Sequence, residues 1–210
     1  TVVRVTGSSY GGVGARMVIR SDGTTVGIVS GGCLESDLAE HARAVGSSGI
    51  PAVVTYDTRA DDDAAWGLGL GCNGLIDVLL EPFTAGEAGA FAVLFEQALD
   101  SSAPVAMATV IESQSPGSAR VGAHALLRPH NTVTCGNWGA ASILPLVAAD
   151  AASAFSSGRR GMIREYDSTR VAFEVVAPLV RLVICGSGPD VVPLVRIGSE
   201  LGWHLTVVDH

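Results

Sequence analysis

The stretch Ser30-Gly31-Gly32-Cys33-Leu34-Glu35-Ser36 lies where a predicted strand, Thr25 to Val29, gives way to a predicted helix. After the two glycines, one apolar helix face is predicted by the spacing of Leu34, Leu38, Ala42 and Val45. We therefore expect Cys33 at a helix N-terminus, where backbone N–H groups and the helix dipole favour a thiolate or a bound anion. The same stretch also fits a small buried cysteine after a glycine turn.

The composition excludes several classes of protein. The 210 residues suffice for one large or two small domains, and the mean hydropathy of +0.39 indicates a well-buried chain. A net charge of −8 argues against binding to nucleic acid. All 13 basic residues are arginine, which excludes a Walker lysine and Schiff-base chemistry. No apolar run is long enough for a membrane span and no leader is visible, so we expect a cytoplasmic protein.

The four cysteines are widely separated in the sequence. Cys33, Cys72, Cys135 and Cys185 form no C-x-x-C motif, which excludes a zinc knuckle and a thioredoxin-like pair. In a reducing compartment we expect free thiols.

An internal duplication is predicted, with repeat units of about 1–82 and 104–178. Val13-Gly14-Ala15-Arg16 recurs as Val121-Gly122-Ala123-His124, and Tyr56-Asp57 recurs as Tyr166-Asp167. We expect the strand that ends at Pro178 to match the strand that ends at Pro82. The predicted fold class is α/β: a duplicated α+β domain over residues 1–178, followed over residues 181–210 by the first βαβ of a Rossmann-like domain, apparently incomplete.

The two repeat units differ where chemistry is expected. The second unit has Ala141 at the position of Cys33 and Ile143 at that of Glu35, and it lacks the insertion 58–74 that contains Cys72. The fold does not require these features, so they favour a functional site.

The insertion surrounds Cys72 and Asn73 with Gly67, Gly69, Gly71 and Gly74, which allow a ligand to approach the backbone closely. Two thiolates on converging loops could hold a soft metal or exchange sulfur. Glu35 fits a proton partner or simply a carboxylate of the first helical turn. Arg16 and Arg59 could neutralise an anionic ligand.

The segment 181–210 has the pattern of a dinucleotide-binding βαβ unit. The strand Leu182 to Cys185 is followed by Gly186-Ser187-Gly188, an amphipathic stretch, and a strand that ends at Asp209. The glycines would bring a pyrophosphate to a helix N-terminus, and Asp209 could bind a ribose. Val191 replaces the third glycine of the usual motif, which puts close packing of helix on strand in doubt.

Taken in order, the Ser30 to Glu35 motif, Tyr56-Asp57-Thr58, the run from Gly67 to Gly74, and Gly186-Ser187-Gly188 resemble the XdhC/CoxI family of maturation factors for molybdenum hydroxylases. The resemblance implies an accessory protein that binds the molybdenum cofactor (molybdopterin), holds it while a cysteine desulfurase replaces an oxo ligand by sulfur, and delivers it to the apo-enzyme, a xanthine dehydrogenase or carbon monoxide dehydrogenase. The family often has Pro-Arg where this chain has Tyr10-Gly11, so an anion contact from that arginine is absent here.

With this resemblance, Cys33 and Cys72 become candidate thiols next to molybdenum, and the expected cofactor contacts are Gly31, Gly32, Glu35, Gly71, Asn73, Arg16 and Arg59. Gly186, Gly188 and Asp209 are the candidate nucleotide contacts. No catalytic residue is predicted, although an enzyme is not excluded. A homo-oligomer is expected. Three alternatives stay open: an NAD(P)-dependent oxidoreductase, a redox protein that pairs Cys33 with Cys72, and a scaffolding dimer.

Overall fold

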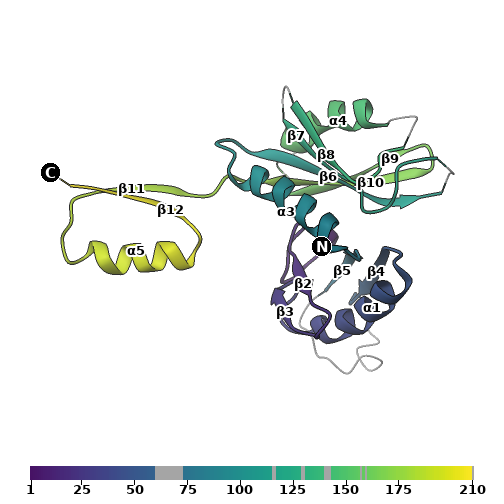
Figure 1. Cartoon of the computed structure of the whole chain (residues 1–210), viewed down its shortest axis with the longest axis horizontal. Helices are drawn as coiled ribbons and strands as arrows, with labels where there is room; N and C mark the ends of the chain where they lie inside the picture. Colours follow the sequence, from purple (N-terminus) through teal and green to yellow (C-terminus); the bar gives the residue numbers. More distant parts are fainter. Residues whose placement is uncertain are drawn as a thin grey trace.

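The computed structural model describes residues 1–59, 73–114, 117–128, 131–139, 143–156, 158 and 160–209. It shows a mixed α/β fold, as predicted, in which two neighbouring sheet units are followed by a separate C-terminal βαβ segment (Figure 1). None of the helices in the described part of the chain is long and apolar enough to cross a membrane.

The first unit contains a three-stranded antiparallel sheet in the order β1-β5-β4, with a separate hairpin of β2 and β3 and one helix, α1. Their bounds are β1 Val2–Gly7, β2 Met17–Ile19, β3 Thr25–Gly27, α1 Glu35–Ser48, β4 Ala52–Asp57 and β5 Gly74–Leu80. The predicted apolar stripe is confirmed, because Leu34, Leu38 and Val45 are buried in the core of this unit. The helix starts two residues after Cys33, with Leu34 as its N-cap.

The second unit contains a five-stranded antiparallel sheet in the order β8-β7-β6-β10-β9. Its elements are β6 Val105–Ser113, β7 His124–Arg128, β8 Asn131–Cys135, α4 Leu144–Ser156, β9 Gly161–Tyr166 and β10 Thr169–Val176. Between the units runs α3, Ala85–Leu99, which packs on β7 and β8 through Leu94 and Ala98. Our sequence interpretation did not include α3. Val3 and Leu79 from the first unit and Ile111 and Ala172 from the second form a buried cluster that joins the two sheets.

The backbone repeats its local hydrogen bonds at a spacing of 108 residues. Gly14 N–H donates to the Val2 carbonyl at 2.9 Å, and Gly122 N–H donates to the Val110 carbonyl at 2.9 Å. Both glycines have positive φ, +89° and +85°, a conformation that glycine adopts without steric cost. The tyrosines repeat as well: Tyr56 donates to Asp37 on α1 at 2.5 Å, and Tyr166 donates to Asp150 on α4 at 2.7 Å. Each tyrosine thereby ties a strand to the helix of its own unit.

Charged side chains connect the units in a reciprocal way. Arg16 of the first unit donates to both carboxylate oxygens of Glu174 at 2.8 and 2.6 Å. His124, which occupies the position 108 residues after Arg16, has its Nε2 2.8 Å from Glu81 Oε1. The β-bulges in the β1/β5 and β6/β10 pairs align Glu81 with Glu174. When the two repeat units are compared by sequence alone, Pro82 aligns with Pro178 instead. The register that the structure shows could therefore not be predicted from the sequence.

The C-terminal segment consists of β11 Arg181–Cys185, α5 Val191–Glu200 and β12 His204–Val208, with β11 and β12 parallel. It extends away from the two sheet units (Figure 1). Gly198, in the last turn of α5, is buried, and a Cβ built on it would lie 2.8 Å from Leu205 Cδ2. Helix and strand thus pack closely at Gly198, although Val191 replaces the third glycine of the usual motif.

Candidate functional site

The loop that contains Cys33 is held together by one hydroxyl. Ser30 Oγ accepts hydrogen bonds from the backbone N–H groups of Cys33 and Leu34, both at 3.1 Å. Gly32 has a φ of +105°, and a Cβ built on it would meet nothing within 4 Å. Cys33 is a partly exposed free thiol immediately before the helix. The loop therefore presents a partly exposed thiol next to a glycine whose Cβ position is open among the described residues.

Glu35 has a structural role in the same loop. Its carboxylate accepts hydrogen bonds from the Ser30 N–H at 2.8 Å, the Ser30 hydroxyl, and the Leu34 N–H at 3.2 Å. Partial burial would raise the pKa of Glu35, but the hydrogen bonds from Ser30 and from neighbouring backbone N–H groups together outweigh it and hold that pKa below its usual value. Of the two roles considered from the sequence, this geometry matches the first-turn carboxylate. Glu35 thereby occupies the N–H groups of Ser30 and Leu34, which lie in the loop where we expected N–H groups to be available to a bound anion.

A neighbouring loop, residues 8–12, lies against the Cys33 loop. A Cβ built on Gly31 would lie 3.4 Å from the Tyr10 ring, and one built on Gly11 would lie 2.0 Å from the Val29 carbonyl oxygen. Within the described part of the chain, the backbone N–H groups of Gly31 and Gly32 have no acceptor. The absence of a side chain at Gly11 thus allows the two loops to approach each other closely.

The same loop also reaches the end of the glycine-rich insertion. Ser8 N–H donates to the Asn73 carbonyl at 3.1 Å, and Asn73 N–H donates to Ser8 Oγ at 3.1 Å. Thr58 N–H donates to the Gly74 carbonyl at 2.8 Å, so both flanks of the insertion lie together where β4 ends and β5 begins. Asn73 and the Cys33 loop are therefore brought to the same end of this unit. Gly71 and Cys72 lie outside the described residues.

Two arginines expected at the cofactor are engaged by carboxylates. Arg16 binds Glu174 and the Gly14 carbonyl, and its guanidinium carbon lies 4.4 Å from the centroid of the Phe95 ring. Arg59 forms a two-pronged ion pair with Asp57, which holds the pKa of Asp57 at about 2. In the part of the chain that the structure covers, neither guanidinium hydrogen-bonds to the Cys33 loop.

The candidate nucleotide residues lie together at the carboxyl end of the parallel strand pair. Ser187 Oγ hydrogen-bonds the Asp209 carboxylate, and Gly186 N–H donates to the Val208 carbonyl at 2.7 Å. Gly186 has a φ of +117°, which favours glycine. In open α/β sheets, ligands bind outside the carboxyl ends of the strands.

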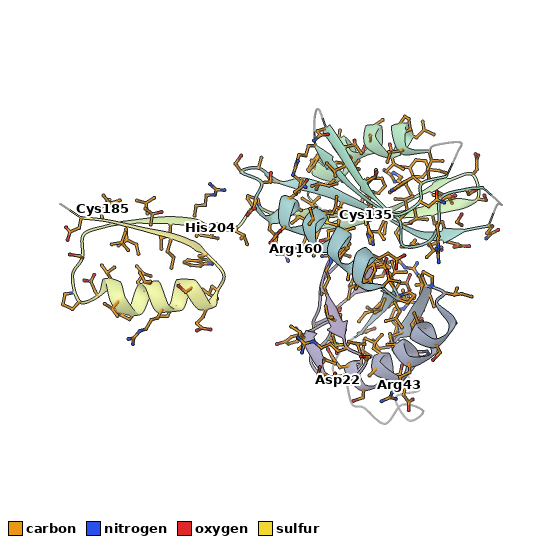
Figure 2. All side chains as sticks on the ribbon, in the orientation of Figure 1. Asp22, Arg43, Cys135, Arg160, Cys185 and His204 are labelled. Atoms are coloured by element: carbon orange, nitrogen blue, oxygen red, sulfur yellow. The ribbon has the colours of Figure 1, made fainter. Side chains whose placement is uncertain are left out.

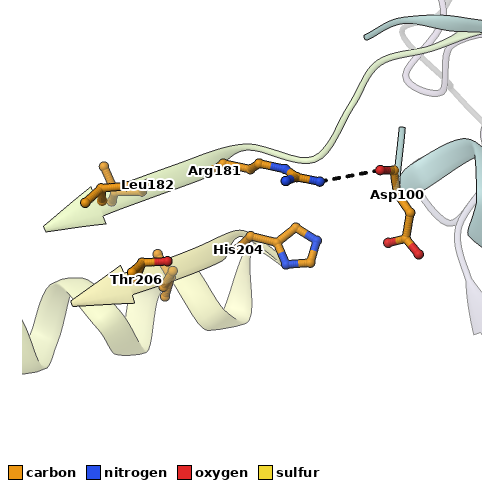
Figure 3. Close-up of a pocket in the computed structure, with 7 residues that line it drawn as sticks. Asp100, Arg181, Leu182, His204 and Thr206 are labelled. Atoms are coloured by element: carbon orange, nitrogen blue, oxygen red, sulfur yellow. Dashed lines mark hydrogen bonds between the residues drawn. The ribbon is translucent and has the colours of Figure 1, made fainter. Parts of the chain in front are cut away.

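A pocket of about 390 Å³ lies at the opposite end of the same strands, where they meet the end of α3 (Figure 3). Arg181 and His204 line it at the starts of β11 and β12, and Arg181 donates to the Asp100 carbonyl at 3.4 Å. Because this is the amino end of the strands, the pocket does not coincide with the candidate nucleotide residues.

The other cysteines lie away from Cys33. Figure 2 places Cys135 in the second unit and Cys185 in the C-terminal segment. Burial raises the pKa of the Cys135 thiol, which makes it a weaker nucleophile than an ordinary cysteine. Within the described ranges, no group of three or more His, Cys, Asp or Glu side chains is placed to hold a metal ion.

The sequence reasoning did not identify Ser30, Ser8 and Tyr10 as parts of this site. A serine directly before two glycines and a helix is a capping signal that could have identified Ser30. The contacts of Ser8 and Tyr10 join loops that are distant in sequence, and no local pattern announces them.

Comparison with known proteins places these observations in a family. The chain is 31% identical over its whole length to a probable xanthine dehydrogenase subunit from Bacillus subtilis, and it spans 58% of that protein. A crystal structure of a xanthine dehydrogenase from Bacillus halodurans matches 99% of the chain at 32% identity and a TM-score of 0.72. The chain spans 56% of that protein, so it covers little more than half the length of both relatives. The model of the XdhC and CoxI family matches residues 1–57 and 98–167, more than half of the chain, which therefore belongs to the XdhC and CoxI family.

Proposed function

We propose that this chain is an accessory factor that binds the molybdenum cofactor, supports its sulfuration, and delivers it to a molybdenum hydroxylase of the xanthine dehydrogenase or carbon monoxide dehydrogenase type. The observation that carries the proposal is the Cys33 loop, which presents a partly exposed thiol directly after two glycines in a member of the XdhC and CoxI family. Both relatives bear the name xanthine dehydrogenase, which supports an enzyme of this type as the partner.

The described residues fit the metal end of such a cofactor better than its phosphate. A thiol is a suitable ligand for a soft metal centre, and Gly32, directly before Cys33, has an open Cβ position among the described residues. The phosphate has fewer candidate partners, because Arg16 and Arg59 already bind carboxylates. The N–H groups of Gly31 and Gly32 are the remaining donors of this loop, and backbone N–H groups are effective phosphate ligands.

Each part of the loop has a distinct task in this proposal. Cys33 holds the metal end of the cargo, and Ser30 fixes the thiol by accepting the Cys33 N–H. Glu35 keeps the turn rigid through its bonds to Ser30 and Leu34. Cys72 would act as the second thiol, since Asn73, the next residue, is held at the same end of the first unit as the Cys33 loop. A partner cysteine desulfurase would supply the sulfur.

We also propose that residues 1–82 and 104–178 are two copies of one unit, of which only the first retains the site. The hydrogen bonds repeated at a spacing of 108 residues and the two tyrosine–aspartate pairs support this duplication. The second copy then acts as a structural partner, joined through Arg16 with Glu174 and His124 with Glu81.

The test is the molybdenum and pterin content of the protein purified anaerobically from a host that makes the cofactor. We expect bound cofactor in the wild type and its loss in Cys33→Ala and Cys72→Ala. Cys185→Ala is the matched control, because Cys185 is an exposed thiol in the C-terminal segment and should leave the content unchanged. A wild-type protein without molybdenum and pterin, or equal content in all three variants, would refute the proposal.

An accessory factor differs from a permanent component of the enzyme in how long it stays bound. A delivery factor should bind the apo-enzyme and dissociate after transfer, so we expect it to be absent from the mature enzyme on gel filtration. Stoichiometric co-elution with the active enzyme would instead identify a permanent component.

A nucleotide site is a second candidate function, favoured by the grouping of Gly186, Ser187 and Asp209 at the carboxyl ends of β11 and β12. Equilibrium dialysis with NADH and NADPH tests it, and Asp209→Ala should weaken binding of the nucleotide with a free 2′-hydroxyl. If neither nucleotide binds, this candidate fails while the cofactor proposal is unaffected.

A further inference from the structure

Tyr10 is a large aromatic side chain at the candidate site that the fold does not bury. Its side chain is 75% exposed, although it lies against the Cys33 loop. The nearest ring atoms, Cγ, Cδ2 and Cδ1, would lie 3.4, 3.5 and 3.8 Å from a Cβ built on Gly31. A Cβ at position 31 would therefore be in van der Waals contact with the ring. The base of the ring rests on the glycine backbone while most of its surface faces solvent.

The loop that carries Tyr10 is fixed on both sides. Ser9 Oγ donates to the Gly11 carbonyl at 2.6 Å, and Ser8 exchanges two hydrogen bonds with Asn73. Gly11 approaches the Val29 carbonyl so closely that any Cβ would clash. The exposure of Tyr10 is therefore not that of a side chain on an unattached loop. Its backbone is positioned between Asn73 and the Cys33 loop.

From this arrangement we propose that Tyr10 is a stacking platform for the planar pterin ring of the cofactor. The inference rests on the proposed function and adds a residue that determines which ligand fits. Aromatic rings prefer offset or edge-to-face contact with other rings, and an exposed ring on a fixed loop offers this contact with little loss of conformational freedom. The pterin ring lies on Tyr10, and the thiol of Cys33 receives the metal end of the same ligand.

The test uses the full chain with reduced thiols and a free pterin, 6-hydroxymethylpterin, which has neither metal nor thiols. Binding is measured by the change in pterin fluorescence. We expect Tyr10→Ala to weaken binding about tenfold, the scale of one ring stacked on an aromatic side chain. Tyr10→Phe retains the ring and should bind as well as the wild type. Val18→Ala is the matched control, because it truncates another exposed side chain of the first unit, on β2.

Two results would overturn the inference: equal pterin affinity of wild type and Tyr10→Ala, or no measurable binding of the free pterin by the wild type. Folding of Tyr10→Ala is checked by circular dichroism, and we expect no change because the side chain is mostly exposed. Failure of this inference is separable from failure of the proposed function. If the wild type contains molybdenum that Cys33→Ala loses, while Tyr10→Ala binds pterin normally, only the stacking role is refuted.

Discussion

The ion pair between Arg16 and Glu174 predicts a large loss of stability when one partner is removed. Its side chains are only 18% and 14% exposed, and the two guanidinium nitrogens lie 2.8 and 2.6 Å from the carboxylate oxygens. Arg16 Nε is buried and has no partner among the described residues. Glu174→Ala would leave the guanidinium largely desolvated with only the Gly14 carbonyl and a ring face as partners. Breaking a buried pair in this way costs about 3 kcal/mol.

The assay is urea unfolding followed by far-UV circular dichroism, with the free energy of unfolding extrapolated to water. Glu112→Ala is the control: Arg170 and Glu112 form a second arginine–glutamate pair, but its side chains are 36% and 39% exposed. An exposed pair contributes about 0 to 1 kcal/mol, so we expect a loss several times smaller. Equal losses for Glu174→Ala and Glu112→Ala would refute the argument that burial sets the cost.

A double variant separates charge from packing. Arg16→Met with Glu174→Leu removes both charges and keeps apolar volume, and such replacements of buried pairs are often neutral or stabilising. We expect it to recover most of the stability lost by Glu174→Ala. A double variant no more stable than Glu174→Ala would show that packing geometry, and not the unpaired charge, causes the loss.

Three further predictions concern single positions. Gly14→Ala should lower the free energy of unfolding by more than Gly23→Ala in the same urea assay: both residues have positive φ, but a Cβ at position 14 would lie 2.7 Å from a carboxylate oxygen and one at position 23 would meet nothing. The carboxyl of Asp57 should titrate near pH 2 by NMR, and Arg59→Ala should raise that midpoint toward the ordinary value. Because the folded pKa is depressed, the pair contributes to the free energy of unfolding above about pH 4, and this contribution is lost as the pH falls toward 2. Thr84→Ala removes the N-cap of α3, whose side chain takes part in a capping box, and should cost about 1 kcal/mol in thermal or urea unfolding; an unchanged midpoint would contradict that role.

Much of the local structure could be predicted from the sequence, because it depends on periodicity and on turn residues. The stripe of Leu34, Leu38 and Val45 predicted α1, and the strand expected from Thr25 to Val29 is found as β3 over Thr25–Gly27. The interpretation missed α3 although its capping signal, Thr84 followed by Glu87, is in the sequence. The apolar residues of that helix extend over much of its circumference, so no clear stripe stands out from the pattern.

The site was predicted less completely than the fold. The Cys33 loop at the start of α1 was expected, and the structure places Asn73 at the same end of the unit. Tyr10 was noticed only as a departure from a family pattern. Its position over Gly31 depends on the docking of two loops about 20 residues apart, and that docking depends on close backbone approach rather than on any periodic signal.

The sequence by itself determined most of the strands and helices in their order, α3 excepted. It also predicted a recurring unit, with the Cys33 and Cys72 motifs confined to the first copy. Only the tertiary structure decided the partners of the charged side chains. Arg16 looks like an anion ligand in the sequence, but it binds Glu174, which is 158 residues away. The physical reason is that periodicity reports which face of an element is apolar, whereas a charge is satisfied by whatever the packing of the two units places within hydrogen-bond distance.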